Sequence, residues 1–373
     1  MPPAEDDSFS GAVMIEGHGG NIFGLAEQLG CRPEEIVDMS SNINPLGALP
    51  GLIEHLGARL DLIRVLPEAD GRSAARAVAA LLGVAAERVL AGGGTTQFIY
   101  AACAALATRK ALVVGPTYAD YADGCRVCGI EPDFFLTRAE QAFALDSEQL
   151  ATVLPGYDTV FLCNPNNPTG HLVDHQVLLD LCARHPRIRF IVDESYLPFA
   201  PADHSQSMSG CGLDNVVVLW SVSKIFGMPG LRAGFLVANE QVLDRFRRLM
   251  PPWCVNSLAL EAVRFLGANQ EAAATFIART RAYLAEEGRL FRQRLRTDRL
   301  ILYPSATSYV LIGLPADRTA DIVCSALAAK RFLIRNCANF HGLGQGYVRI
   351  ALKDAATNEA VVRPLRTAVG AED

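Results

Sequence analysis

One short stretch of the chain places two hydroxyl groups, an amine and a guanidinium close together. In VLWSVSKIFGMPGLRAGF, residues 218–235, Ser221 and Ser223 precede Lys224, and Arg232 follows after several glycines. Two hydroxyls and an arginine suit an anion such as a phosphate. A lysine beside them suits a different task, a covalent bond to a carbonyl group. The rest of the chain has to decide between these two interpretations.

A glycine-rich turn and an asparagine motif follow two other apolar runs. In AGGGTTQFIY, residues Gly94, Thr95 and Thr96 lie between an expected strand and an expected helix, where free backbone N–H groups bind anions. In NPNNPTG, Asn164 and Asn167 precede prolines, which favours an extended, turn-rich path at a strand end. The glycine-rich turn alone is weak evidence of a site, and the asparagine motif is the more specific of the two.

A carboxylate and a phenol end a further apolar run. In RFIVDESY, Asp193 closes the run and Tyr196 follows. A carboxylate at a largely buried strand end is costly unless a cation meets it. The cation is either a core arginine or the protonated nitrogen of a bound ring.

Together these residues fit pyridoxal 5′-phosphate. We expect Lys224 to bond covalently to the cofactor aldehyde and Asp193 to keep the ring nitrogen protonated. We expect Asn167 and Tyr196 to hydrogen-bond the ring oxygen, and Tyr118 of GPTYADY to lie against the ring face. The expected phosphate ligands are Ser221, Ser223, Arg232, Gly94, Thr95 and Thr96.

The elements that would position these residues alternate in type. Short apolar runs such as KALVVG and NVVVLW alternate with longer Ala- and Leu-rich helical patterns. This alternation predicts an α/β fold in which helices cover both faces of a parallel sheet. Ligands of such sheets bind beyond the carboxyl ends of the strands, so we expect the site there.

The pattern changes after LMPPWCVNSLA. Residues 257–296 show long helical patterns and residues 300–350 return to short strands, which predicts a second, smaller α+β domain. Pro251 and Pro252 mark the expected hinge. The expected division is an N-terminal arm with part of the small domain in 1–48, a large cofactor-binding domain in 49–250 and the small domain in 251–373.

Composition narrows the classes of protein. The 373 residues carry a formal net charge of −6 without any basic block, which argues against nucleic acid as a partner. The acidic N-terminus lacks a signal pattern and no segment is apolar enough for a membrane span, so we expect a cytoplasmic protein without a membrane partner. The ten cysteines are scattered, and we read them, including Cys125 and Cys128, as thiols. We read His171 and His175 as surface residues and expect no metal.

The motifs NPNNPTG, DESY and SVSK, followed by Arg232, resemble those of the fold-type I, aspartate-aminotransferase-like superfamily. The resemblance covers most of the chain. It implies a large domain with a mostly parallel seven-stranded sheet, a smaller α+β domain, and a homodimer with its active sites at the subunit interface.

The ends of the chain are similar to a narrower family, the L-threonine-O-3-phosphate decarboxylases of cobalamin biosynthesis. The similar segments are GHGGNIFGLAEQLG, SSNINPLG, PWCVNSLA, YPSATSYVL and FLIRNCANFHGLGQGYVRIAL. The resemblance implies decarboxylation of O-phospho-L-threonine to (R)-1-amino-2-propanol O-2-phosphate and CO2, for the nucleotide loop of cobalamin.

This resemblance adds five substrate-binding positions. Arg349 matches the superfamily arginine that binds the substrate α-carboxylate. Arg335 and His18 match positions near the substrate phosphate, Asn42 matches one at the substrate entrance, and Gly47 could offer a backbone contact. Without the resemblance, either arginine could pair with a surface acid, and His18 could belong to an arm that is merely docked.

The chain also departs from its relatives. Leu66 stands before Pro67 where a tyrosine commonly reaches the cofactor phosphate of the neighbouring subunit. Its loss puts in doubt one hydrogen bond worth about 1–3 kcal/mol if it is charge-assisted. The turn GGGTTQ lacks a common acidic residue, and Ser308 replaces a frequent asparagine.

Other functions stay open. An aminotransferase of the histidinol-phosphate type, or a decarboxylase of O-phosphoserine, would use the same cofactor residues. A non-catalytic ligand-sensing or scaffold protein on the same fold is the alternative from another class. Such proteins often lose the lysine or the aspartate, whereas this chain has both Lys224 and Asp193.

Overall fold

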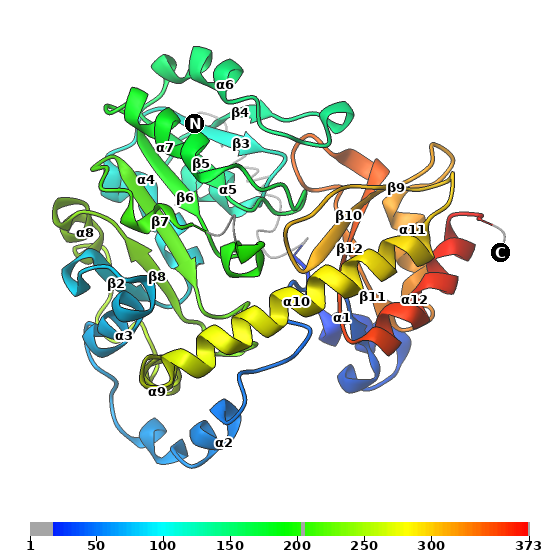
Figure 1. Ribbon diagram of the computed structural model, residues 1–373, viewed down its shortest axis with the longest axis horizontal. Helices are drawn as coiled ribbons and strands as arrows, with labels where there is room; N and C mark the ends of the chain where they lie inside the picture. Colours follow the sequence, from blue (N-terminus) through cyan, green and yellow to red (C-terminus); the bar gives the residue numbers. More distant parts are fainter. Residues whose placement is uncertain (1–17, 203–205, 372–373) are drawn as a thin grey trace, which may run out of the picture.

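A seven-stranded sheet forms the larger half of the computed structural model, which describes residues 18–202 and 206–371 (Figure 1). The spatial order of its strands is β2-β8-β7-β6-β5-β3-β4. Their bounds are β2 (Val89–Gly92), β3 (Ala111–Gly115), β4 (Asp133–Leu136), β5 (Thr159–Cys163), β6 (Arg189–Asp193), β7 (Val216–Ser221) and β8 (Gly234–Val237).

This sheet is mostly parallel. Strands β3 to β7 pair in parallel, whereas β8 runs antiparallel to both of its neighbours, β7 and β2. All residues of β5 and β7 are buried, which is typical of a sheet with helices on both faces. The sheet confirms the predicted α/β fold class.

The register brings polar strand ends to one edge of the sheet. Cys163 of β5 pairs with Asp193 of β6, and Asp193 pairs with Leu219 of β7. Ser221, at the end of β7, pairs with Gly234 at the start of the antiparallel β8. Asp193 and the turn that follows Ser221 therefore meet at the carboxyl edge.

Helices of the larger half pack on the sheet and on one another. α4 contacts α5 and α8, and α3 packs against α9 (Figure 1). Their bounds are α3 (Arg72–Leu82), α4 (Thr95–Leu106), α5 (Asp120–Val127), α6 (Ser147–Val153), α7 (His175–Arg184), α8 (Glu240–Arg247) and α9 (Ser257–Ala268).

A four-stranded antiparallel sheet forms the smaller half, in the order β12-β13-β10-β9. α10 spans 26 residues and runs from the larger half to the smaller (Figure 1). The elements of this half are β9 (Ile301–Leu302), β10 (Tyr309–Gly313), β12 (Arg335–Asn336), β13 (Tyr347–Ala351), α10 (Gln270–Leu295), α11 (Ala320–Ala328) and α12 (Ala355–Ala368).

The N-terminal part of the described chain contributes to the smaller half. β1 (Val37–Asp38) pairs in parallel with β11 (Phe332–Leu333), and α1 (Ile22–Leu29) lies beside them. The chain then passes α2 (Leu52–Gly57) and the 3₁₀ turn Leu60–Arg64, which project from the body of the molecule at the edge of Figure 1.

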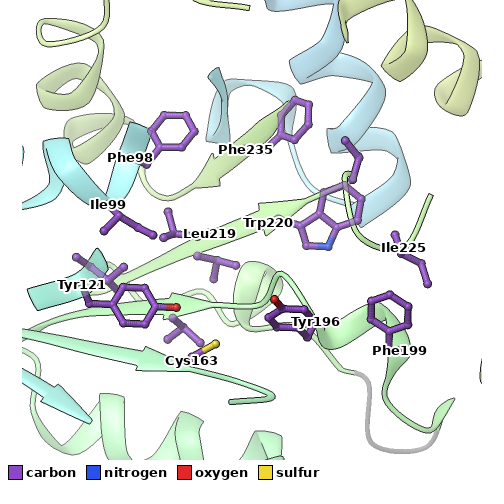
Figure 2. Packing of buried hydrophobic residues seen from close by; sticks show 14 of the residues in the cluster. Phe98, Ile99, Tyr121, Cys163, Tyr196, Phe199, Leu219, Trp220, Ile225 and Phe235 are labelled. Atoms are coloured by element: carbon purple, nitrogen blue, oxygen red, sulfur yellow. The ribbon is translucent and has the colours of Figure 1, made fainter. Parts of the chain in front are cut away.

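Apolar side chains of α4 pack on those of the central strands. Figure 2 shows Phe98 and Ile99 of α4 with Leu219 of β7 and Phe235 of β8. Each of these four side chains is 1% exposed or less. The core thus lies directly against the strands whose ends carry the polar residues, and it limits how far those ends can move.

The two histidines that we read as surface residues are half-buried. His171 precedes α7, and its Nε2 accepts a hydrogen bond from the backbone N–H of Leu145 at 3.4 Å. Burial lowers the pKa of His171. This corrects the expectation for His171, because the segment that contains Leu145, just before α6, lies against its ring. Cys125 and Cys128 are a buried and a half-buried thiol.

Candidate active site

A cavity of about 190 Å³ lies at the carboxyl edge of the large sheet. It is lined from the larger half by the ends of β5, β6 and β7, and from the smaller half by β12 and β13. Its lining residues are His18, Gly19, Ser40, Ser41, Asn42, Gly94, Thr95, Thr96, Tyr118, Tyr121, Cys163, Asn167, Asp193, Ser195, Tyr196, Ser221, Ser223, Lys224, Arg232, Arg335, Phe340 and Arg349.

The amine of Lys224 lies in this cavity on the turn that follows β7. Its backbone carbonyl accepts a hydrogen bond from the N–H of Asn44 at 3.0 Å, which ties the turn to the N-terminal segment. Burial, together with the nearby cations Arg349 and Arg232, lowers the pKa of Lys224 to about 8, against the opposing charges of Asp193 and Asp38. A lysine in this state is an accessible nucleophile near neutral pH.

The carboxylate of Asp193 is 5% exposed and held from two sides. It accepts hydrogen bonds from the backbone N–H of Ser195 at 2.9 Å and from the hydroxyl of Tyr121 at 2.8 Å. The ring of Tyr121 in turn stacks on Phe161 with centroids 5.8 Å apart. Burial raises the pKa of Asp193, and the two hydrogen bonds oppose that rise. A cation bound in the cavity would stabilise the ionised form.

Two tyrosines lie in the same region of the core. Figure 2 shows Tyr121 and Tyr196 on either side of Cys163, and both tyrosines line the cavity. The hydroxyl of Tyr196 accepts a hydrogen bond from Nδ2 of Asn42 at 3.1 Å. Burial is the main reason that the pKa of Tyr196 rises to about 12. The phenol is therefore protonated at neutral pH and can donate to a bound oxygen.

The side chain of Arg349 on β13 reaches across the cavity to Asn167, which follows β5 of the large sheet. Its guanidinium donates to Oδ1 of Asn167 and, at 2.6 Å, to the backbone carbonyl of Ser40. Its Nε and the Oδ1 of Asn42 have no hydrogen-bond partner among the described residues. Because buried polar atoms are normally paired, these two atoms are candidates for contacts with a ligand.

A cradle for an anion lies at the start of α4. Gly94 has φ of 101°, and no side chain of the described residues caps the helix N-terminus. A Cβ at Gly234 would lie 2.2 Å from the backbone N of Thr95, so only glycine lets β8 approach the turn this closely. Arg232 reaches the same turn, because a Cβ at Gly94 would lie 2.8 Å from its Nη2.

The two serines beside Lys224 complete this cradle. Ser221 accepts a hydrogen bond from the backbone N–H of Ser223 at 3.2 Å, and the hydroxyl of Ser223 donates to the carbonyl of Ala233 at 3.0 Å. These bonds fix both side chains at the cavity wall, next to the free N–H groups of α4. Such a group of donors suits a phosphate.

A second cationic group lies at the end of the cavity formed by β12. Arg335 is 8% exposed, donates to Oδ1 of Asn339 at 2.6 Å and lies 4.9 Å above the ring centre of Phe340. Burial lowers the pKa of Arg335 to about 10, which still leaves it charged at neutral pH. His18 lies at the same cavity, with Nε2 3.5 Å from Oδ1 of Asp120.

All the residues predicted for the site except Gly47 line this cavity. Gly47 instead closes a turn, donating to the carbonyl of Asn44 at 3.0 Å. Its own carbonyl packs against Gly227, where a Cβ would come within 2.3 Å of it. Gly47 therefore supports the Lys224 turn from behind, and its expected backbone contact with the substrate remains a prediction. Leu66 is 74% exposed and lies outside the lining.

Several lining residues were not predicted. Ser195 lies in the motif DESY near Asp193, and Tyr121 lies in GPTYADY near Tyr118. Their closeness to predicted site residues could have identified them, whereas a serine or a tyrosine by itself does not indicate a site. Phe340 lies in NCANFHGL, where we would expect a phenylalanine to pack in the hydrophobic core and not to line a site. The further residues are Gly19, Ser40, Ser41 and Cys163.

The residues present fit pyridoxal 5′-phosphate. The α4 cradle suits its phosphate, the buried Asp193 suits a protonated ring nitrogen, and Lys224 suits its aldehyde. The unpartnered Nε of Arg349 and Oδ1 of Asn42 leave further bonds for a substrate joined to the ring.

Comparison with known proteins places this geometry in a family. The chain is 35% identical to the threonine-phosphate decarboxylase of Salmonella typhimurium over 95% of this chain and 97% of that protein. It is 30% identical to the histidinol-phosphate aminotransferase of Methanosarcina mazei over 92% of this chain and 91% of that protein. The solved L-threonine-O-3-phosphate decarboxylase of Porphyromonas gingivalis matches 89% of this chain and 99% of its own with a TM-score of 0.78 and 29% identity.

The family match spans nearly the whole chain. The aminotransferase class I and II family matches residues 34–369, which include both sheets and every predicted cofactor residue. This match confirms the superfamily that the sequence motifs predicted. The chain belongs to the aminotransferase class I and II family.

Proposed function

We propose that this protein uses pyridoxal 5′-phosphate to decarboxylate O-phospho-L-threonine to (R)-1-amino-2-propanol O-2-phosphate and CO2. One observation carries the proposal: a single cavity holds Lys224 and Asp193 together with two buried arginines, Arg335 and Arg349. The first pair suits the cofactor, and the second suits a substrate with both a carboxylate and a phosphate. The similarity to threonine-phosphate decarboxylases supports the same assignment.

The cofactor, when bound, supplies an aldehyde for covalent attachment and a ring that accepts the electrons of the broken bond. The amine of Lys224 is free to attach because burial holds its pKa near 8. Asp193 would keep a proton on the ring nitrogen, Asn167 and Tyr196 would hydrogen-bond the ring oxygen, and the α4 cradle with Arg232 would bind the phosphate. Nζ of Lys224 would be the group that returns a proton to the substrate α-carbon once CO2 has left.

Whether the bound substrate loses CO2 or a proton from its α-carbon depends on how the substrate is oriented in the cavity. Arg349 is held by Asn167 and by the carbonyl of Ser40, whereas Arg335 is held by Asn339. We propose that Arg349 binds the carboxylate and Arg335 the phosphate, so that the two contacts fix which bond of the α-carbon is broken.

Transamination is the second candidate, because the chain is also similar to histidinol-phosphate aminotransferases. Purified enzyme loaded with cofactor and incubated with O-phospho-L-threonine, O-phospho-L-serine or histidinol phosphate separates the candidates. We expect CO2 and the amine product from O-phospho-L-threonine. A keto acid formed in the presence of a 2-oxo acid acceptor would contradict decarboxylation and favour transamination.

We also propose a homodimer whose active sites lie at the subunit interface. The projecting segment with α2 and the turn Leu60–Arg64 exposes several apolar side chains, and Trp253 is exposed as well. Those of the segment are Ile53, Leu60, Ile63, Val65 and Leu66. An apolar surface of this kind is typical of protein interfaces. Light scattering coupled to size-exclusion chromatography should give twice the chain mass of 40.2 kDa.

The separate sheets support a division into two halves, and β1 pairs with β11 of the smaller half in a two-stranded sheet of its own. α9 packs against α3 of the larger half and so departs from the proposed boundary at residue 251. Limited proteolysis near Pro251 tests it.

The described helices include none with the length and apolarity needed to cross a bilayer. We propose a cytoplasmic location and a role in assembling the nucleotide loop of cobalamin; the N-terminal residues considered for a signal lie outside the described chain. Cell fractionation checks the location.

A further inference from the structure

The ring of His18 lies next to a carboxylate that the sequence did not single out. Oδ1 of Asp120 is 3.5 Å from Nε2 of His18, and the side chain of Asp120 is 3% exposed. This oxygen has no hydrogen-bond partner among the described residues. A buried carboxylate oxygen is costly when no donor reaches it, so a small turn of the imidazole would satisfy both groups.

Asp120 hydrogen-bonds the hydroxyl of Tyr118, which opposes the effect of burial on its pKa, and stabilisation of the helix does not explain why this acid is buried. It is the first residue of α5, where an acid stabilises the helix through its dipole. Asp123 lies in the same first turn and does this at the surface, where it also accepts a hydrogen bond from Arg126 at 3.2 Å. Asp120 instead points into the protein beside the cavity, at the cost of a raised pKa caused by burial.

The backbone next to His18 is fixed against the smaller half. The N–H of Gly20 donates to Oγ of Ser40 at 2.7 Å. A Cβ at Gly19 would lie 2.5 Å from the carbonyl oxygen of Ser40, so only glycine allows this approach. With the backbone held there, the direction of the ring depends on its neighbours Asp120 and Tyr118, whose ring centre is 5.8 Å away.

We propose that Asp120 is a positioning residue for the substrate phosphate. It accepts a hydrogen bond from Nε2–H of His18, and the doubly protonated imidazolium ring then donates through its second nitrogen to the phosphate, together with Arg335. Both His18 and Arg335 line the cavity, so one bound phosphate can meet the two of them. This inference rests on the proposed function, which supplies the phosphorylated substrate.

Two effects of Asp120 on the phosphate oppose each other. Its negative charge repels a phosphate dianion, whereas its hydrogen bond orients the imidazole toward that dianion. Direct charge-assisted contact by His18 is stronger than repulsion from a group behind the ring. Replacement of Asp120 should therefore weaken phosphate binding, and a tighter phosphate complex would overturn the inference.

Binding without turnover tests the pair. O-phosphoethanolamine has the amine and the phosphate but no carboxylate to lose, and ethanolamine lacks the phosphate. Calorimetry on the cofactor-loaded enzyme compares wild type, D120N, H18N and the double variant. We expect D120N and H18N each to lose roughly tenfold in affinity for O-phosphoethanolamine, the value of one charge-assisted hydrogen bond, with the affinity for ethanolamine unchanged.

The double variant decides whether the two residues act as one unit. We expect it to lose no more than H18N alone, and D120E to recover part of the affinity. D123N is the matched control and should bind as wild type does. Additive losses, or an equal loss for ethanolamine, would overturn the inference.

Failure of the proposed function would look different. If O-phospho-L-threonine released no CO2 while O-phosphoethanolamine still bound through the pair, the proposed decarboxylation would be wrong and the role of Asp120 would stand. If wild type bound O-phosphoethanolamine no better than ethanolamine, the role of Asp120 would fall even with CO2 released.

Discussion

The cavity has two walls, and they are built differently. The cofactor wall comes from consecutive strand ends of one sheet, where Asp193 is paired to Ser195 and Tyr121. The substrate wall is assembled from the N-terminal segment and from β12 and β13, which lie near the other end of the sequence. In that wall, Nε of Arg349 and Oδ1 of Asn42 lack partners among the described residues.

This difference separates what the family shares from what each member does. Binding of the cofactor to this protein depends on the first wall, whose residues stand in short contiguous motifs. The second wall meets only the substrate, so its unpaired atoms and its cations decide which reaction follows. Substitutions in the first wall should affect every substrate, whereas those in the second should affect one substrate class.

The largest expected effect is that of K224A on the cofactor wall. Loss of the only amine that the structure places beside Asp193 should lower kcat on the order of 10⁴-fold or more, because covalent attachment and proton return both depend on it. Borohydride reduction followed by peptide mass analysis measures the attachment. Label found on another lysine in the wild-type protein would contradict the assignment.

D193N should have the next largest effect, a loss on the order of 10³-fold in kcat, because a neutral amide cannot keep the ring nitrogen protonated. The matched control is E194Q at the adjacent buried acid. Glu194 accepts from the backbone N–H of Met208 at 2.7 Å and does not line the cavity. Equal losses in both variants would mean that only folding was affected, and circular dichroism would show this.

The two walls also differ in how far the sequence predicts them. Strand periodicity gave the parallel sheet, and motifs at strand ends gave Lys224, Asp193 and Asn167, because residues next to a strand end share its edge. Asp120 and Gly47 depend on which segments pack together. The contact of Gly47 with Gly227 joins two turns that are distant in sequence, and no local pattern marks it.

On the substrate wall, R335Q should raise KM for O-phospho-L-threonine roughly 100-fold and leave the cofactor spectrum unchanged, because a buried guanidinium is lost from the phosphate contact. The control is R331Q, since Arg331 is exposed and pairs with Glu35 at 2.6 Å. Steady-state kinetics measure both. A fall in kcat with unchanged KM would place Arg335 in the chemical step.

The cofactor wall makes a prediction about pH as well. Burial lowers the pKa of Lys224 to about 8, so its neutral amine forms as pH rises through that value. Capture of pyridoxal 5′-phosphate by the cofactor-free enzyme should therefore speed up roughly tenfold from about pH 7 to about pH 9 and then level off. Nα-acetyl-lysine in solution, which keeps its side-chain amine, is the control. The rate of its reaction should continue to rise above about pH 9. A profile for the enzyme that also keeps rising would show an unperturbed lysine.

The smallest expected effect lies at the edge where a second subunit would complete the cofactor wall. Leu66 is 74% exposed on the projecting segment, at the position where the sequence resemblance leads us to expect a tyrosine. In the proposed dimer, L66Y would add one hydrogen bond to the cofactor phosphate of the neighbouring subunit. Cofactor release should slow roughly fivefold, which corresponds to about 1 kcal/mol. The control is I63Y, since Ile63 lies on the same segment and is 68% exposed. Equal slowing in both variants would show a general effect of added aromatic surface, and unchanged release in both would mean that position 66 lies away from the neighbouring cofactor.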